Sequence, residues 1–252
     1  FSELLTNIKP DAVNHHAAQA SVKISVLDPK HDLLINGSGT ANIAMLSAMH
    51  GVKHLIYASS GGTLYGQPLE NPVNENAEIK PLSPYGVSKF AGEEYVKFVA
   101  RSSEMNTTIF RYGNVFGPRQ DPGGEAGVIA IFAGNLLTGK PCVIDGDGEQ
   151  VKDYIYVSDI ADINTLVLEE DSTKTNETFN IGTGIGISVN TIYRTLREQI
   201  GGDITPAYGP ARIGDVRKII LDCGFVKRQL GWQVKKTFAA GIENTIAALK
   251  NP

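Results

Sequence analysis

Tyr85 and Lys89 are the two residues of this sequence best placed for acid–base chemistry. They lie four positions apart in the stretch SPYGVSKFAGE, and residues at that spacing share one face of a helix. A lysine ammonium beside a phenol favours the phenolate, so it would lower a tyrosine pKa that is otherwise about 10. Tyr85 could then serve as a general acid or base near neutral pH. The spacing alone is a weak signal, since a solvated Tyr and Lys on a helix surface would look the same.

A cluster of hydroxyl side chains upstream strengthens this interpretation. Ser59 and Ser60 end the apolar run KHLIYASS and begin the glycine-rich stretch SSGGTLYG. Hydroxyls at the carboxyl end of a parallel strand lie where open α/β sheets bind their ligands. A serine there could share a proton with Tyr85 on a substrate oxygen, although either serine alone could simply form a turn.

Strands and helices that could position these residues alternate along the first half of the chain. We expect strands at 11–16, 53–59 and 107–112, and helices at 28–50 and 84–101. Because long helical crossovers join neighbouring parallel strands, this order predicts an α/β fold with a doubly wound parallel sheet.

The regular alternation of strands and helices ends after Gly113, where loops rich in Gly and Pro lead to shorter, mixed elements. We interpret residues 1–112 as part of a nucleotide-binding domain that carries Tyr85 and Lys89. Residues 113–252 are interpreted as mainly a smaller, mixed, substrate-binding lobe, with some segments returning to the sheet.

Charge and cysteine content narrow the function classes. The net charge of -4 and the lack of any Lys/Arg run argue against a nucleic-acid binder, and no apolar segment approaches the ~18–20 residues of a membrane span. Cys142 and Cys223 follow no metal-ligand or redox spacing, so we expect reduced thiols and a cytoplasmic location. Adjacent strand residues such as His15 and His16 point to opposite faces, and we expect no metal site.

Eight stretches together resemble the NAD-dependent epimerase/dehydratase family of extended short-chain dehydrogenase/reductases, and most of all its UDP-glucose 4-epimerase branch. They span nearly all 252 residues in family order: PDAVNHHAAQASV, NGSGTANI, ASSGGTLYG, SPYGVSKFAGE, RYGNVFGPRQDP, VKDYIYVSDIA, FNIGTG and RIGDVRKIILDCGFVKRQLGW. The resemblance implies a Rossmann-like sheet, NAD as cofactor and a UDP-sugar as substrate. It also implies a homodimer or higher self-association through the helices at 28–50 and 84–101.

The resemblance further implies a role for each matching residue. Tyr85 would take the proton from the sugar 4-hydroxyl while hydride passes to the nicotinamide, and Lys89 would hold the nicotinamide ribose. The family's Ser/Thr falls at Ser60 when counted from the strand and at Gly61 when counted back from Tyr65; we favour Ser60. Besides Tyr85 and Lys89, the cofactor would be lined by His16, Ala17, Ala18, Gln19, Asn36, Ala58, Ser59 and Tyr112. The substrate would contact Ser60, Asn114, Lys152, Tyr154, Arg212 and Asp215.

Family members open with a strand, a glycine-rich turn and a helix that hold the NAD pyrophosphate, and this sequence contains no such motif. We therefore expect an N-terminally truncated sheet without its first βαβ elements, and weak NAD binding. A truncated remnant that binds UDP-sugar but holds NAD poorly is the main alternative to an active nucleotide-sugar 4-epimerase. A nucleotide-sugar dehydratase or decarboxylase is the second, although those branches have acidic residues where this chain has Gly61 and Gly62.

Overall fold

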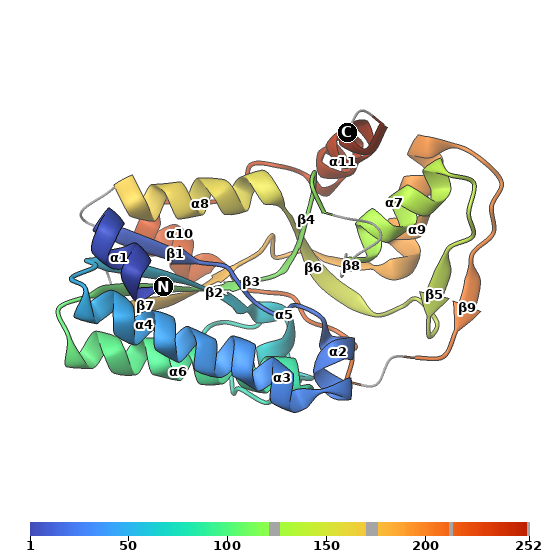
Figure 1. Ribbon diagram of the computed structural model, residues 1–252. Helices are drawn as coiled ribbons and strands as arrows, with labels where there is room; N and C mark the ends of the chain where they lie inside the picture. The colour runs from blue at the N-terminus through green and yellow to red at the C-terminus, as the bar shows by residue number, and fades with distance from the viewer. Residues whose placement is uncertain (121–126, 170–175, 212–213, 251–252) are drawn as a thin grey trace.

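A parallel sheet of four strands, in the order β1-β2-β3-β7, forms the centre of the molecule (Figure 1). The strands are β1 (Ala12–His15), β2 (His54–Ser60), β3 (Asn106–Tyr112) and β7 (Glu177–Ile181). Every neighbouring pair is parallel, as the long crossovers predicted. The computed structural model describes residues 1–120, 127–169, 176–211 and 214–250.

Strand β2 divides its side chains between two apolar layers, one on each face of the sheet. Leu55 and Tyr57 belong to one layer, whereas Ile56 and Ala58 belong to the other. This follows from the pleat, which turns successive side chains to opposite faces. All four residues are buried, so the sheet is covered on both sides, as a parallel sheet requires.

Helices from the first part of the chain cover the face of Leu55 and Tyr57 (Figure 1). The longest begins at Pro84, directly after Ser83, whose hydroxyl accepts a hydrogen bond from the Gly86 N–H at 3.3 Å. The helices on this side are α1 (Ser2–Ile8), α2 (Val22–Leu27), α3 (Pro29–Leu33), the π-helical turn η1 (Leu34–Ser38), α4 (Gly39–Met49) and α6 (Pro84–Ser102). A short helix, α5 (Gly61–Leu64), follows β2 directly.

Two later helices cover the opposite face of the sheet: α8 (Val157–Glu169) and α10 (Gly224–Leu230). Ile163 of α8 and Val226 of α10 pack in one cluster with Phe110 and Phe179 of the sheet. Helices therefore lie on both faces of a parallel sheet, which confirms the predicted α/β fold class.

The remaining elements, some between β3 and β7 and others after β7 in the chain, extend to one side of the sheet (Figure 1). Strand β6 pairs parallel with β4 and antiparallel with β8, while β5 pairs parallel with β9. Helices α7, α9 and α11 share an apolar cluster that includes Phe132, Ile192 and Ile242. The strands are β4 (Asn114–Phe116), β5 (Val143–Asp145), β6 (Val151–Tyr156), β8 (Gly186–Ser188) and β9 (Ala207–Gly209), and the helices are α7 (Val128–Leu137), α9 (Val189–Ile200) and α11 (Phe238–Lys250). A domain boundary after residue 112 stays a prediction.

Candidate active site

The carboxyl edge of the parallel sheet brings together residues from distant parts of the sequence. Ser60 ends β2 and is the register partner of Tyr112, which ends β3. His16 directly follows β1, and Tyr85 lies in the first turn of α6. Ligands of open α/β sheets bind at this edge, so the fold places the predicted catalytic residues where such chemistry occurs.

Burial raises the pKa of the Tyr85 phenol to about 12, whereas hydrogen bonding toward the Ser60 side chain lowers this pKa and the charge of Asp32 raises it further. The sequence led us to expect a pKa lowered by Lys89. The structure differs because burial has the largest effect on this pKa, and the Lys89 ammonium lies 6.0 Å from the Tyr85 ring centroid and donates to the Ala58 carbonyl, at 2.9 Å.

Lys89 lies inside the protein, with only 3% of its surface exposed. Its ammonium also lies 5.1 Å from the ring centroid of Tyr57, within the range of a cation–π contact. Burial lowers the pKa of Lys89 to about 8, while the charges of Asp32 and Glu93 raise it. The ammonium form therefore predominates at neutral pH and is fixed beside the end of β2.

Gln19 and Asn36, two predicted cofactor-lining residues, bind each other in the interior. The Gln19 backbone N–H donates to Asn36 Oδ1 at 2.9 Å, and Asn36 Nδ2 donates to the Gln19 carbonyl at 2.8 Å. Both side-chain amides also donate to Asp32 Oδ1, Gln19 at 2.6 Å and Asn36 at 3.0 Å. Their side chains thus hold a buried carboxylate, and a contact with the cofactor stays a prediction.

His16 and Tyr112 stack at the ends of β1 and β3, with ring centroids 5.8 Å apart. Asn164 of α8 joins them: its Nδ2 donates to the Tyr112 hydroxyl at 2.8 Å, and its Oδ1 lies 3.3 Å from His16 Nε2. Burial lowers the pKa of His16. The other predicted cofactor residues also lie at these strand ends: Ala17 and Ala18 after β1, and the buried Ala58 and Ser59 within β2.

The predicted substrate residues fall into different environments. Asn114 is exposed at the start of β4, beside Gly62: a Cβ built on that glycine would lie 3.0 Å from Asn114 Oδ1 and 4.0 Å from Ser60 Oγ. Lys152 forms an ion pair with Asp215 at 2.8 Å and also donates to the Val216 carbonyl.

Tyr154 is only 6% exposed and packs in an apolar cluster near Phe238. Arg212 lies outside the described residues. The structure therefore places Asn114 close to Ser60, whereas Tyr154 lies mainly in the core.

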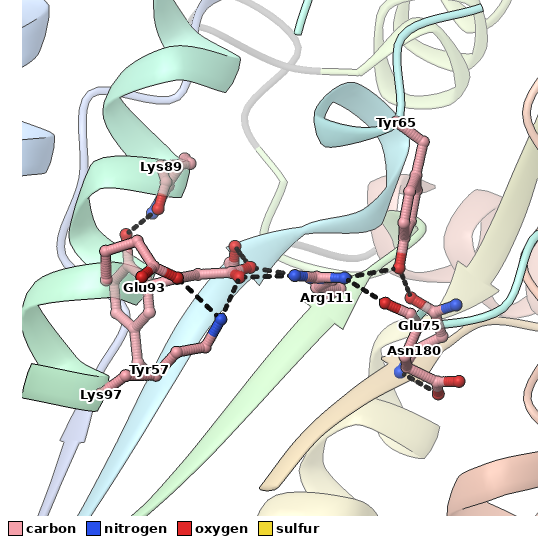
Figure 2. Close-up of polar contacts among 10 residues, drawn as sticks. Tyr57, Tyr65, Glu75, Lys89, Glu93, Lys97, Arg111 and Asn180 are labelled. Atoms are coloured by element: carbon pink, nitrogen blue, oxygen red, sulfur yellow. Dashed lines mark hydrogen bonds and ion pairs between the residues drawn. The ribbon is translucent and has the colours of Figure 1, made fainter. Parts of the chain in front are cut away.

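A buried ionic network behind the site was not predicted from the sequence. Figure 2 shows Arg111 of β3 between Glu93 of α6 and Tyr65. Its Nε and Nη2 donate to Glu93 Oε1 and Oε2 at 2.9 and 2.7 Å, and its Nη1 donates to the Tyr65 hydroxyl at 2.9 Å. Ser59, the neighbour of Ser60, donates to Glu93 at 2.6 Å. The available signal was a charged residue inside the apolar strand TTIFRY, since buried charges require partners.

Asp153 of β6 explains the glycines of the motif FNIGTG. Its carboxylate accepts hydrogen bonds from the backbone N–H groups of Thr183 and Gly184, at 2.8 and 2.9 Å. A Cβ at Gly182 would lie 2.6 Å from Asp153 Oδ2, so a larger residue there would displace the carboxylate. The motif thus closes the loop after β7 around a buried acid.

Among the described residues, no helix has both the length and the apolar character needed to cross a bilayer. In the same ranges, the His, Cys, Asp and Glu side chains form no group of three or more suited to a metal ion.

A parallel α/β sheet with a Tyr and Lys pair on the helix beside its carboxyl edge is the arrangement expected of a short-chain dehydrogenase/reductase. The sequence model of the NAD dependent epimerase/dehydratase family matches residues 1–182. The chain is 42% identical over 241 residues to the putative UDP-glucose 4-epimerase of Methanocaldococcus jannaschii, covering 96% of this chain and 77% of that protein.

Two solved structures are similar over nearly the whole chain. The UDP-glucose 4-epimerase of Thermotoga maritima, solved with UDP-glucose, superposes with a TM-score of 0.95 at 43% identity, covering 99% of this chain and 80% of that one. The enzyme of Thermus thermophilus, solved with NAD, gives a TM-score of 0.91 at 36% identity, with coverages of 99% and 81%. The chain therefore belongs to the NAD dependent epimerase/dehydratase family. The predicted family, its enzymatic character and its dependence on NAD are confirmed at this level.

Proposed function

We propose that the protein is a nucleotide-sugar 4-epimerase of the UDP-glucose/UDP-galactose type, with Tyr85 as its acid–base residue. The observation that carries this proposal is the placement of Ser60 at the end of β2 and Tyr85 in the first turn of α6, with the Lys89 ammonium fixed at the Ala58 carbonyl. The substrate class follows from the two UDP-glucose 4-epimerases that superpose on the chain.

The residues at the sheet edge fit the nicotinamide end of NAD. Lys89 offers a buried ammonium whose position is fixed by the Ala58 carbonyl, and His16 presents an exposed ring beside Tyr112. These residues, together with Tyr85, would hold the nicotinamide and its ribose. When bound, NAD would supply a hydride acceptor at the positively charged nicotinamide ring.

Tyr85 and Ser60 would move the proton of the sugar 4-hydroxyl. With its pKa raised to about 12, the Tyr85 phenol is protonated at neutral pH and can donate to a sugar oxygen. A phenolate at Tyr85, favoured by a positive charge close to it such as that of a bound nicotinamide, would accept the hydroxyl proton. Ser60 would orient the sugar oxygen between its own hydroxyl and that of Tyr85.

Ser60 rather than Gly61 is the proposed serine of this step. The Ser60 hydroxyl reaches Tyr85 and also accepts a hydrogen bond from Thr63 at 2.9 Å. At Gly61 a Cβ would lie 2.7 Å from Leu221 Cδ1 and 2.9 Å from the Arg111 carbonyl. The lack of space for a side chain at Gly61 supports the assignment to Ser60.

Charged and amide groups beyond β3 would bind the nucleotide part of the substrate. Asn114 would contact the phosphates close to Ser60, and Lys152 with Asp215 would lie around the diphosphate and uridine. We propose the same region for Arg212, whose guanidinium suits a diphosphate. Tyr154 is proposed to contact the substrate as well.

The experiment compares Tyr85→Phe with the unchanged chain in the presence of NAD and UDP-glucose. Loss of the phenol should lower the rate of UDP-galactose formation by a factor of about 10²–10⁴ and leave the circular dichroism spectrum unchanged. Tyr95→Phe, on the exposed side of α6, is the control and should keep full turnover. Equal activity of Tyr85→Phe and the unchanged chain would contradict the proposed mechanism.

Calorimetry separates the epimerase from a remnant that does not hold NAD, and mass spectrometry of the product separates it from a dehydratase. A remnant that holds NAD poorly would bind UDP-glucose but show no heat with NAD, and would form no UDP-galactose. A dehydratase would release a 4-keto-6-deoxy sugar, which mass spectrometry detects as a loss of water. Turnover to UDP-galactose without that loss is the result expected here.

We also propose that the protein is a homodimer assembled through α4 and α6. These helices expose several large apolar side chains on one side: Met45, Met49, Val87, Tyr95 and Phe98. A patch of this kind on a folded protein marks an interaction surface. The cytoplasmic location remains a proposal, supported by the free thiols of Cys142 and Cys223.

A further inference from the structure

A carboxylate behind the proposed catalytic pair is buried without a bonded cation. Asp32 of α3 is 0% exposed, and its oxygens accept hydrogen bonds from three neutral groups: Ser88 Oγ at 2.5 Å, Gln19 Nε2 at 2.6 Å and Asn36 Nδ2 at 3.0 Å. Among the described residues, Asp32 takes part in no ion pair. A buried charge is costly unless an opposite charge lies near it.

Lys89 is a buried cation in α6, the helix that packs against α3 and Asp32. It is 3% exposed, and its ammonium contacts a carbonyl and two aromatic rings rather than a carboxylate. The nearby carboxylate of Glu93 is already paired with both arms of the Arg111 guanidinium. Among the described residues, neither Asp32 nor Lys89 therefore has a direct ion-pair partner, although their charges act on each other.

Ser88 connects these two charges through the backbone of α6. Its hydroxyl contacts Asp32 Oδ2 at 2.5 Å and the carbonyl oxygen of Tyr85 at 3.0 Å, and Lys89 is the next residue. The Asp32 carboxylate is thus bonded to the turn that carries both Tyr85 and Lys89.

We propose that Asp32 is a positioning residue for the Tyr85 and Lys89 pair, holding their turn of α6 through Ser88 and balancing the charge of the Lys89 ammonium. The inference rests on the proposed function for the roles of Tyr85 and Lys89, but the contacts of Asp32 do not depend on it. Asp32 acts through other residues, since its oxygens are enclosed and bonded to protein groups.

The titratable groups around Lys89 come from every element packed against it. They are Tyr57 of β2, His15 of β1 and His16 directly after it, Asp32 of α3, and Tyr85 and Glu93 of α6 itself. Burial lowers the pKa of Lys89, and of the charges that raise it the Asp32 carboxylate has the largest effect. The same carboxylate also raises the pKa of Tyr85. Removing its charge should therefore move both titrations to lower pH.

The test follows the Lys89 side chain by NMR in the full chain labelled with ¹³C-lysine, with Lys89→Met used to assign its Cε signal. In Asp32→Asn the midpoint of the Lys89 titration should fall by about one pH unit from its wild-type value. Ser88→Ala breaks the bond to the helix but keeps the charge, so its midpoint should stay at the wild-type value. Asp159→Asn removes another buried carboxylate, on α8 at the opposite face of the sheet, and should also leave the Lys89 midpoint unchanged.

An unchanged Lys89 midpoint in a folded Asp32→Asn variant would overturn the proposal. Should that variant fail to fold, Asp32→Glu and Ser88→Ala carry the test, because both keep the charge while disturbing the hydrogen bond. A lower midpoint in either variant would show that the hydrogen bond between Ser88 and Asp32, and not the Asp32 charge, determines the pKa of Lys89. That result would refute the proposal that Asp32 balances the Lys89 charge.

Turnover provides a separate reading of the same variants. In the chain with NAD bound, both limbs of the pH profile of kcat/KM should move to lower pH in Asp32→Asn, whereas a purely structural loss would lower the whole profile without moving it. Absence of epimerisation in the wild type would refute the proposed function. The Lys89 titration would still decide the role of Asp32.

Discussion

The Glu93 carboxylate on α6 receives two hydrogen bonds from Arg111 on β3, at 2.9 and 2.7 Å, in a fork-to-fork pair with both side chains at 5% exposure or less (Figure 2). This pair joins the helix of Tyr85 and Lys89 to the strand that ends at Tyr112. Ser59 and Tyr65 complete the hydrogen bonds of the two charges. Because the two charges are buried and hydrogen-bonded to each other, the network ties the helix to the sheet edge.

Breaking this pair from one side should destabilise the protein strongly. Arg111→Met leaves the Glu93 carboxylate charged and enclosed, so we expect a loss of about 3–5 kcal/mol in the free energy of unfolding. Urea unfolding followed by circular dichroism measures this loss. Arg217→Met is the matched control, because Arg217 pairs with Asp147 at 2.6 Å but is 54% exposed, and its loss should be much smaller than that of Arg111→Met. Similar losses in the two variants would show that burial of the Arg111 pair does not matter.

His15 should make the stability depend on pH below neutrality. Burial, with a smaller effect from the Lys89 charge, lowers the pKa of His15 to about 4 in the folded protein, whereas the unfolded chain binds the proton near pH 6.5. The unfolded state therefore holds more protons between these values, and stability falls as the pH drops from 6.5 to 4, by about 3 kcal/mol from this residue.

Urea unfolding at several pH values gives the free energy of unfolding at each pH, and its slope against pH measures the contribution of His15. His15→Gln should lose that part of the slope, while His31→Gln, at an exposed position of α3, should keep it. The interpretation fails if the wild type and His15→Gln show the same pH dependence.

Gly92 marks the closest approach of α6 to the sheet. A Cβ at this position would overlap the Tyr57 hydroxyl and lie 2.9 Å from Tyr57 Cζ. Gly92→Ala should therefore destabilise the protein by about 1–3 kcal/mol, although the same change in an open helix stabilises by up to about 1 kcal/mol. Gly39→Ala in α4, where the nearest atom is 3.6 Å away, is the control and should be neutral or stabilising. Thermal unfolding of both variants checks the sign of each effect.

The proposed dimer should depend on the apolar side of α4 and α6. Phe98 is 54% exposed, and Phe98→Glu would place a charge in the middle of the interface. Light scattering after size-exclusion chromatography should then give the mass of a monomer, against that of a dimer for the unchanged chain. Leu168→Glu, at a 44% exposed position of α8 on the opposite face, should remain dimeric. A monomeric wild type would rule out this assembly.

The sequence by itself determined the local structure around the site. The sequence predicted a helix at 84–101 with Pro84 in its first turn, and the helix of the structure begins at Pro84. Apolar runs separated by long helical crossovers predicted parallel strands, whose carboxyl ends must share one edge. These features depend on neighbouring residues along the chain, so periodicity and capping rules can find them.

Only the tertiary structure decided the electrostatics of the site. The sequence predicted a lowered pKa for Tyr85 from the nearby Lys89, but burial raises it, and the Lys89 ammonium points to the Ala58 carbonyl. Asp32 reaches Ser88 across 56 positions, and Arg111 reaches Glu93 from the next strand. Burial and the distance between charges are set by how separate elements pack, and no local pattern in the sequence records them.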